Sequence, residues 1–527
     1  MIRADKEKFS GGYLRLFSYI KEAKEIFRHL SFLKEFDINL DPLFENLASL
    51  SDEQRQILKK EYLVVKDIFE RHKDYKEILE NILRNFGYFL DNFKSIEAWL
   101  KSDEFYENFK NKKHPYPSLL NPKEINYDDI SAELAFSLYL PLQPDRCNFV
   151  WFCRNSTGLG AISSFFNHMK VDFKPPYAYW DVKSWYVFLY EDKNRIISVE
   201  IGLMYILYHF IPKDIKLFCV YRDPISYIKH MINHVDWKII PGKKIINLRT
   251  NLKSENLFSK SKNVTTKTFT PCVSSLEHPW VLDYMLNFHK AMDVLDSKNK
   301  EVYMLEFEDI NFQNAFDTFT KLAYKFGFNP PSNKELFQHR VNRSNGDLFT
   351  LPVTFVAHKS DLDYIYDENK EDHKENESSF NMLGGFKILI TTYQFTPERD
   401  KFLDITKEIF ADRELMFKNL ILLIKRDKYK AFKRNERLFL ASKQYINSYV
   451  SVMEKYEQEI NDKLITEEDI LEYLRDYKDL RNKYKTLIEE DLRYVKKYHP
   501  EYIQKWKYYQ EFLKLCEKDE LETKDEN

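Results

Sequence analysis

The stretch NFVWFCRNSTGLGAISSFF, residues 148–166, decides the fold of this chain. It begins with an apolar run, continues into a short loop of Arg, Asn, Ser, Thr and Gly, and ends in a second apolar segment. An apolar run bounded by turn residues is typical of a buried strand, and small polar residues before an apolar segment are typical of a helix start. We therefore predict a strand, a tight turn and a helix.

Working outward from this stretch, similar short apolar runs alternate with helical patterns. These runs cover residues 196–199, 215–221 and 302–307. Short apolar runs separated by helices are typical of a parallel sheet that is covered on both faces. The predicted fold class is α/β, with this parallel sheet in a core that spans residues 131–350.

The flanking regions have a different character, because apolar residues recur there at helical spacing among many charges. A stretch that contains three prolines interrupts the first helical region and predicts a linker. The basic segment 238–267 predicts a long mobile insertion. Outside the core we predict five regions: a helical region at 1–112, a linker at 113–130, a mobile acidic loop with an edge strand at 351–395, a helical region at 396–516 and a disordered tail at 517–527.

Composition restricts the function and the compartment. Lys and Arg number 81 against 83 Asp and Glu, so the chain has no overall attraction for nucleic acid. The five cysteines are scattered without a CxxC motif, which is typical of a reducing compartment. The longest apolar run, 201–211, is too short to cross a bilayer. We expect a cytoplasmic protein without a transmembrane segment.

The loop after the first strand contains the groups that hold a phosphate. Free backbone N–H groups and the positive end of a helix attract an anion, hydroxyl groups donate further hydrogen bonds, and an arginine adds charge. The loop is not a Walker A motif, and an ordinary turn in which Ser or Thr caps the helix is the alternative interpretation. The candidate residues here are Arg154, Asn155, Ser156, Thr157, Gly158 and Gly160.

A second junction lies in IPKDIKLFCVYRDPISYIKHMINH, residues 211–234. Arg222 and Asp223 follow the apolar run, and Pro224 takes the first position of a helix. Ligands of open α/β sheets bind outside the carboxyl ends of the strands, so Arg222 is predicted to lie where it could grip a phosphate. Asp223 is predicted to cap the helix.

A third stretch, EVYMLEFEDINFQNAFDTFTKLAYKFGFNPP at 301–331, is followed by the polar segment HRVNRSNGDLF at 339–349. The order of these segments resembles the sulfotransferase superfamily. The resemblance implies that Ser156, Thr157 and Gly158 face the donor's 5′ phosphate and Arg222 its 3′ phosphate. It also implies that Arg343 and Ser344 lie on a loop that closes over the nucleotide.

The chain departs from the superfamily pattern at two positions. The family has a Lys in the first loop, where Arg154 is the nearby cation here, and it has a Ser eight residues after the Arg, where this chain has His230. These departures leave the donor open between one like 3′-phosphoadenylyl sulfate and a cytidine or uridine diphosphate-linked one.

Two flanking segments, 119–142 and 499–512, resemble a bacterial family of uncharacterised proteins and sugar transferases associated with capsule and surface-polysaccharide loci. This second resemblance implies a saccharide acceptor and a partnership with capsule or surface-glycan assembly machinery.

The acceptor hydroxyl needs a base. Glu200 follows the run at 196–199 and could take the proton, and His209 is the rival. The alternative interpretations are a solvated or capped carboxylate for Glu200 and a core histidine for His209. Arg154 completes the candidate catalytic set.

We therefore predict a nucleotide-dependent, sulfotransferase-like transferase that acts on a hydroxyl of a cell-surface polysaccharide or its precursor and needs no metal. One alternative is a metal-dependent glycosyltransferase, which would use the DxD pair Asp361 and Asp363. The other is a non-catalytic assembly protein with a degenerate nucleotide fold.

Overall fold

The structure is a computed structural model of the 527-residue chain. It describes residues 26–525, except for residues 27, 48, 144–146, 155, 174–180, 192–194, 201–204, 212–214, 285, 287, 297–300, 339–349, 366–384 and 393–398. The predicted site residues Asn155, Arg343 and Ser344 lie outside the described residues.

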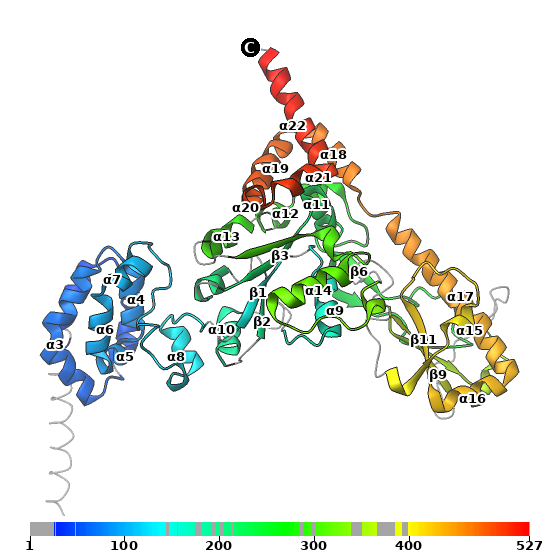
Figure 1. Ribbon diagram of the computed structural model, residues 1–527, viewed down its shortest axis with the longest axis horizontal. Coiled ribbons are helices and arrows are strands. Elements are labelled where there is room, and N and C mark those ends of the chain that lie inside the picture. Colours follow the sequence, from blue (N-terminus) through cyan, green and yellow to red (C-terminus); the bar gives the residue numbers. More distant parts are fainter. Residues whose placement is uncertain are drawn as a thin grey trace, which may run out of the picture.

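The first part of the chain forms a helical lobe, which lies to one side of the central sheet in Figure 1. A capping box opens its longest helix, because the Ser51 hydroxyl accepts from the Gln54 N–H while the Gln54 side chain accepts from the Ser51 N–H. Its elements are η1 (Leu30–Glu35), α2 (Asp41–Leu47), α3 (Asp52–Arg71), α4 (Lys76–Arg84), α5 (Phe86–Asp91), α6 (Phe93–Leu100), α7 (Asp103–Phe105) and η2 (Tyr106–Lys110).

The predicted linker, 113–130, packs against this lobe. The amide of Asn81 donates to the carbonyl of Pro117 at 2.9 Å, and the indole of Trp99 donates to the carbonyl of Ser118 at 3.0 Å. Its one regular turn, η3 (Tyr127–Asp129), is followed by α8 (Ala132–Ser137). The prolines interrupt the helices as predicted, but the segment between them is anchored to the lobe.

A parallel sheet lies in the predicted core. Within the described residues it has four strands in the order β2-β1-β3-β7, and each neighbouring pair is parallel. The strands are β1 (Cys147–Cys153), β2 (Arg195–Glu200), β3 (Leu217–Tyr221) and β7 (Val302–Glu306). The prediction of a parallel sheet is confirmed.

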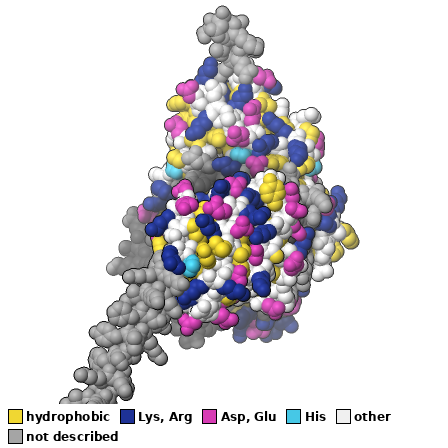
Figure 2. All heavy atoms as spheres, turned by 90° about the vertical axis from the view of Figure 1, so that its left-hand side faces the viewer, with side chains coloured by type: hydrophobic (Ala, Val, Ile, Leu, Met, Phe, Trp, Pro, Cys, Tyr) yellow, Lys and Arg dark blue, Asp and Glu magenta, His cyan; other side chains and the backbone are white. Residues whose placement is uncertain are grey.

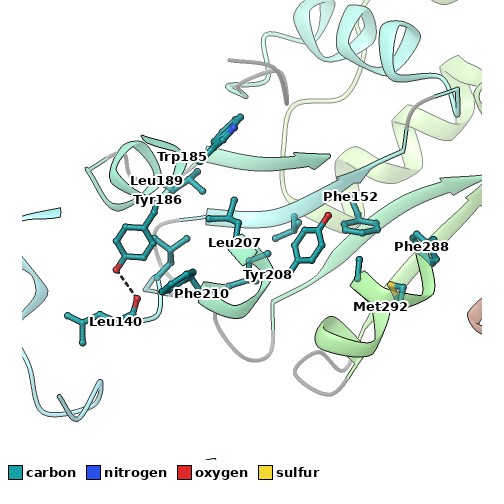
Figure 3. Close-up of a cluster of buried hydrophobic side chains, with 14 of the residues drawn as sticks. Leu140, Phe152, Trp185, Tyr186, Leu189, Leu207, Tyr208, Phe210, Phe288 and Met292 are labelled. Carbon is teal, nitrogen blue, oxygen red and sulfur yellow. Dashed lines mark hydrogen bonds between the residues drawn. The ribbon is translucent and has the colours of Figure 1, made fainter. Parts of the chain in front are cut away.

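Helices cover both faces of this sheet. Phe152 and Cys219 face one side, where α10 (Val182–Glu191), η5 (Tyr205–Phe210) and α13 (Phe288–Asp296) pack. Trp151 and Phe218 face the other side, which α9 (Leu159–His168) and α14 (Ala315–Phe326) cover. Figure 3 shows the first face, where the Phe152 ring lies between Tyr208 and Phe288 with centroids 5.2 Å away in both cases. Successive side chains of a strand point to opposite faces, so one apolar run supplies both cores.

A second sheet forms from segments for which the sequence predicted an insertion, a loop with an edge strand and a helical region. Within the described residues its strand order is β10-β11-β9-β8-β5; β5 pairs with β8 in parallel and the other pairs are antiparallel. Its strands are β5 (Ile245–Asn247), β8 (Val353–Ala357), β9 (Phe386–Thr392), β10 (Phe402–Asp404) and β11 (Leu420–Lys425). The helices against it are α15 (Thr406–Phe410), α16 (Arg426–Arg434) and α17 (Glu436–Asn461).

Three expectations were therefore wrong. The run at 386–391 is a central strand rather than an edge strand, because β8 and β11 flank it. The region from 396 onward is not helical throughout, since it contains β10 and β11. The segment 238–267 is not a simple insertion, because it contains β5 and also β6 (Lys260–Asn263), which pairs in antiparallel with β4 (Val235–Ile240). A short apolar run fits a strand or a buried helix equally well until its partners are known.

The last helices return to the central sheet, above which they lie in Figure 1. They are α18 (Glu467–Asp476), α19 (Lys478–Asp491), α20 (Arg493–Tyr498), α21 (Pro500–Lys505) and α22 (Lys507–Asp525). We call α18–α22 the C-terminal cap. Because α22 continues to Asp525, most of the tail that was expected to be disordered is helical.

The remaining short elements connect these parts. They are α11 (Pro224–Ile232), η6 (Val273–Glu277), α12 (Pro279–Tyr284), η7 (Phe307–Ile310), η8 (Lys334–Phe337), η10 (Lys359–Asp361) and η13 (Arg399–Lys401). Of the helices that the structure describes, none combines the length and apolar character needed to cross a bilayer. On the face drawn in Figure 2, Lys and Arg side chains are interspersed with Asp and Glu, in keeping with the near-neutral charge of the chain.

Candidate functional site

The turn after β1 is tight and has an unusual backbone. Ser156 has a φ of 65° and Gly158 a φ of 88°, both in the left-handed region. The Thr157 hydroxyl is buried and donates to the carbonyl of Arg154 at 2.7 Å, which closes the turn. At Gly158 an added Cβ would lie 2.2 Å from Cδ1 of Ile310. The left-handed backbone therefore favours glycine at this position, and any side chain here would also require the Ile310 side chain to move.

The turn leads directly into α9. Gly158 is the N-cap, and the first helical hydrogen bond runs from the Ile162 N–H to the Gly158 carbonyl at 2.9 Å. The amides of residues 159–161 therefore have no acceptor within the helix, and Gly158 has no side chain that could cap it. An added Cβ at Gly160 would meet nothing within 4 Å. The first turn of α9 thus combines amides that its own helix does not satisfy with the positive end of the helix dipole, and a side chain at position 160 would have room.

Arg222 joins this turn to the neighbouring one. Its Nη1 donates to the carbonyl of Ser156 at 2.8 Å, and its guanidinium lies 4.4 Å from the centroid of the Phe307 ring. Its Nε is buried and has no hydrogen-bond partner in the described part of the chain. Burial lowers the pKa of Arg222 to about 10, although the carboxylates of Glu467 and Asp223 oppose this shift. The guanidinium is thus poorly solvated, and the described residues do not satisfy all of its donors.

Asp223 anchors the other side of this junction. One of its carboxylate oxygens accepts from the N–H of Ile225 at 2.8 Å, as the sequence predicted for a helix cap. The second oxygen accepts from the N–H groups of Tyr508 and Tyr509 at 3.0 and 3.1 Å. One carboxylate therefore caps α11 and also holds the start of α22. Burial raises its pKa, against the effect of these hydrogen bonds.

The Arg154 guanidinium is paired with a carboxylate of the C-terminal cap. Its Nη2 lies 2.6 Å from a carboxylate oxygen of Asp491, and both side chains are buried. The guanidinium also lies over the Tyr227 ring, 4.1 Å from its centroid. Burial opposes the charge, but Asp491 outweighs it and raises the pKa of Arg154. These contacts assign Arg154 a structural role in fastening the C-terminal cap, and they do not support the catalytic role expected from the sequence.

A carboxylate of the C-terminal cap lies close to Arg222. Glu467, in the first turn of α18, accepts from the Ser226 hydroxyl at 2.7 Å and forms an ion pair with Lys229 at 2.7 Å. Burial opposes its ionisation, but Lys229 and Ser226 lower the pKa of Glu467 below its ordinary value. No local motif marks Glu467 or Asp491 in the sequence, because each belongs to a different part of the chain from its partners.

The two candidate bases lie in different places. Glu200 ends β2 directly beside Cys153, at the same carboxyl edge as the turn, and only its backbone is described. The ring of His209 packs instead against His114 and Tyr116, with centroids 5.2 Å away in both cases. Of the two, only Glu200 lies at the edge of the sheet from which the Ser156 turn leaves.

His230 lies in the last turn of α11, with its ring centroid 6.3 Å from that of His234. The DxD carboxylates belong to the second sheet and both pair with arginines: Asp361 with Arg249 at 2.8 Å and Asp363 with Arg437 at 3.3 Å. Among the described residues, no three acidic, His or Cys side chains gather closely enough to hold a metal ion.

The fold and this edge define a mixed α/β protein whose parallel sheet carries a candidate anion site where β1 and β3 end. The model of a family described as "Protein of unknown function (DUF2972)" matches residues 304–519. This segment contains Glu467 and Asp491 but neither Ser156 nor Arg222. No curated protein matches the chain.

Proposed function

We propose that this protein is a nucleotide-dependent group transferase with a sulfotransferase-like core. The observation that carries the proposal is the hydrogen bond from Arg222 to the carbonyl of Ser156, because it joins two neighbouring crossover turns at the start of α9. The amides of residues 159–161 have no acceptor within α9, and the Nε of Arg222 has no hydrogen-bond partner among the described residues. Such a set of donors suits the phosphate chain of a nucleotide.

The chemistry would be an in-line transfer. The acceptor oxygen forms a bond to the transferred group, the bond between that group and the nucleotide phosphate breaks, and the nucleotide leaves with the electron pair. The helix end and Arg222 would stabilise the negative charge that develops on the leaving phosphate. Glu200 is our candidate for the base that takes the acceptor proton, on the basis of its place at the end of β2. The acceptor is a hydroxyl of a surface saccharide, as the family resemblance implies.

A non-catalytic assembly role is the second candidate, and one observation favours it. Two charged groups near the site, Arg154 and Glu467, are already engaged within the protein. A glycosyltransferase mechanism based on Asp361 and Asp363 has less support, because each carboxylate is paired with an arginine.

Titration of the purified full chain with ADP, CDP, UDP and adenosine 3′,5′-bisphosphate tests the proposal. We expect at least one nucleotide to bind, and Arg222→Gln to weaken that binding by about tenfold to a hundredfold, since hydrogen bonds to charged groups contribute about 1.5–3 kcal/mol. Arg434→Gln, on the exposed surface of α16, is the matched control and leaves binding unchanged. Absence of binding by every nucleotide would contradict the proposal.

Gly160→Glu provides a second test that does not depend on removing a contact. The position has open space for a side chain, and a carboxylate near a helix start stabilises the helix, so the variant should fold. The same carboxylate would repel a phosphate, and we expect nucleotide affinity to fall at least about tenfold. Nucleotide release in the presence of saccharide acceptors then separates the two candidates, because binding without turnover supports the assembly role.

A further inference from the structure

The ribbon of β4 and β6 presents lysines and apolar side chains together. Ile240 pairs with Lys260 across the two antiparallel strands, and cross-strand partners have their side chains on the same face. Lys262 lies two residues further along β6 and therefore shares this face. Ile240 is 46% exposed, and its neighbour Ile239 is 41% exposed. Cations and large apolar side chains are thus in contact with solvent in one place.

A hydrogen-bonded turn after β6 holds a further apolar side chain beside these lysines. The Asn263 side chain accepts from the Thr265 N–H at 2.9 Å, and the Asn263 N–H donates to the carbonyl of Thr268 at 2.7 Å. Phe269, the next residue, is 56% exposed, and the Lys262 ammonium lies 6.0 Å from the centroid of its ring. We call the following residues the basic-apolar surface: Lys238, Ile239, Ile240, Lys260, Lys262 and Phe269.

The charge of this part of the chain is unbalanced. Residues 238–271 contain seven Lys and one Arg against a single acid, Glu255, although the whole chain has a net charge of -2. Lys267 pairs with Asp236 at 3.9 Å. Within the described part of the chain, none of the three lysines of the basic-apolar surface pairs with an acid. Their charge is therefore available to an anionic partner.

We propose that the basic-apolar surface docks this protein on a bilayer that contains anionic lipids. Lysines gain from the negative potential of such a bilayer, and apolar side chains gain by entering the boundary between headgroups and acyl chains. A nucleic acid or an acidic polysaccharide would also attract the lysines, but neither offers an apolar phase to the isoleucines. The inference goes beyond the proposed function, because the ribbon contains none of the residues assigned to the nucleotide.

Co-sedimentation of the purified full chain with vesicles tests this inference. One set of vesicles consists of phosphatidylcholine alone, and the other contains phosphatidylglycerol as well. We expect the protein to bind the anionic vesicles at least about tenfold more tightly, and added salt to weaken this binding. Absence of binding to the anionic vesicles, or equal binding to both sets, overturns the inference.

The double variant Lys260→Glu/Lys262→Glu reverses two charges of the surface. We expect it to bind the anionic vesicles at least about tenfold more weakly, because each lysine near such a surface contributes a factor of about five. Lys94→Glu/Lys483→Glu is the matched control, since it makes the same change in net charge at exposed positions of α6 and α19, and it should bind like the wild type. An equal loss in both double variants would assign the binding to net charge and overturn the inference.

The variant Ile239→Ser/Ile240→Ser separates a bilayer from an anionic polymer, because it keeps every charge. Both side chains are already about half exposed, so the variant should fold. We expect its affinity for the anionic vesicles to fall at least about fivefold, through the loss of apolar area that the bilayer buries. If it binds vesicles like the wild type while the lysine variant does not, the surface is a site for anionic polymers and the inference is overturned.

Discussion

Two arginines occupy equivalent places in the central sheet, but their electrostatic surroundings differ. Arg154 follows the last residue of β1 and Arg222 follows the last residue of β3, the neighbouring parallel strand. Arg154 is neutralised by Asp491, which raises its pKa, whereas burial lowers the pKa of Arg222 against the weaker opposing effect of Glu467 and Asp223. The paired cation, Arg154, holds the fold together, and Arg222 is the cation to which the proposed function assigns the ligand.

The largest loss of stability should come from removing the counter-charge of Arg154. Asp491→Ala leaves the buried guanidinium of Arg154 without its counter-charge, and removing one partner of a buried pair costs about 3–5 kcal/mol. Chemical denaturation of the variant measures this loss. The double variant Arg154→Met/Asp491→Leu removes both charges and should regain most of the stability. Equal stability of Asp491→Ala and the wild type would show that the pair does not fasten the cap.

A smaller loss is expected at Asp223, which connects Arg222 to the cap. Asp223→Ala removes the side-chain acceptor from the starts of both α11 and α22, and each lost cap costs about 1 kcal/mol, so that we expect a loss of about 2 kcal/mol. Asp223→Asn, which keeps one acceptor oxygen, should fall between the alanine variant and the wild type. Thermal unfolding of the three proteins measures the order, and an Asn variant less stable than the Ala variant would contradict the double-cap interpretation.

Gly158 tests whether the turn between the two arginines must have its observed shape. Gly158→Ala places a methyl group 2.2 Å from Cδ1 of Ile310 and in a left-handed conformation. Left-handed strain in a non-glycine residue and local overpacking each cost about 1–3 kcal/mol, and a shift of the Ile310 side chain would keep the total near 2 kcal/mol. Gly158→Ala/Ile310→Ala separates the two causes, because it removes the clash and keeps the strain. No stability difference between Gly158→Ala and the wild type would show that the turn can relax.

The smallest change in stability should come from replacing Arg222. Arg222→Gln removes a buried charge that has no full counter-charge, together with one hydrogen bond to a backbone carbonyl. These two changes oppose each other, so we expect the free energy of unfolding to change by less than about 1 kcal/mol. A loss as large as that of Asp491→Ala would place Arg222 with the structural arginines and remove the contrast between the two sites.

The sequence predicted the elements that depend on local pattern. The run at 148–152 and the polar loop after it became β1 and its turn, and the placing of Asp223 and Pro224 at the start of α11 followed from their ordinary helix-start preferences. The parallel sheet also brought Ser156 and Arg222 together, since the carboxyl ends of neighbouring parallel strands lie at one edge.

Other features depend on partners that no local pattern announces. Arg154 had the residue type and position of a phosphate ligand, and only the arrival of Asp491 from α19, more than three hundred residues later, assigns it a different role. The strand β11 lies between highly charged segments whose apolar spacing is typical of helices. Its pairing with β9 determines its conformation. Long-range pairing of this kind overrides local propensity.

The C-terminal cap has a consequence for how the chain is made. It contacts the ends of three strands in turn: β1 through Asp491, β3 through Tyr508 and β7 through the bond from Trp506 to Glu306 at 2.8 Å. On the ribosome the strands of the central sheet all emerge by Glu306, whereas Trp506 and Tyr508 emerge only after a further two hundred residues have been translated. The strands are therefore translated about two hundred residues before the helices that cover their ends.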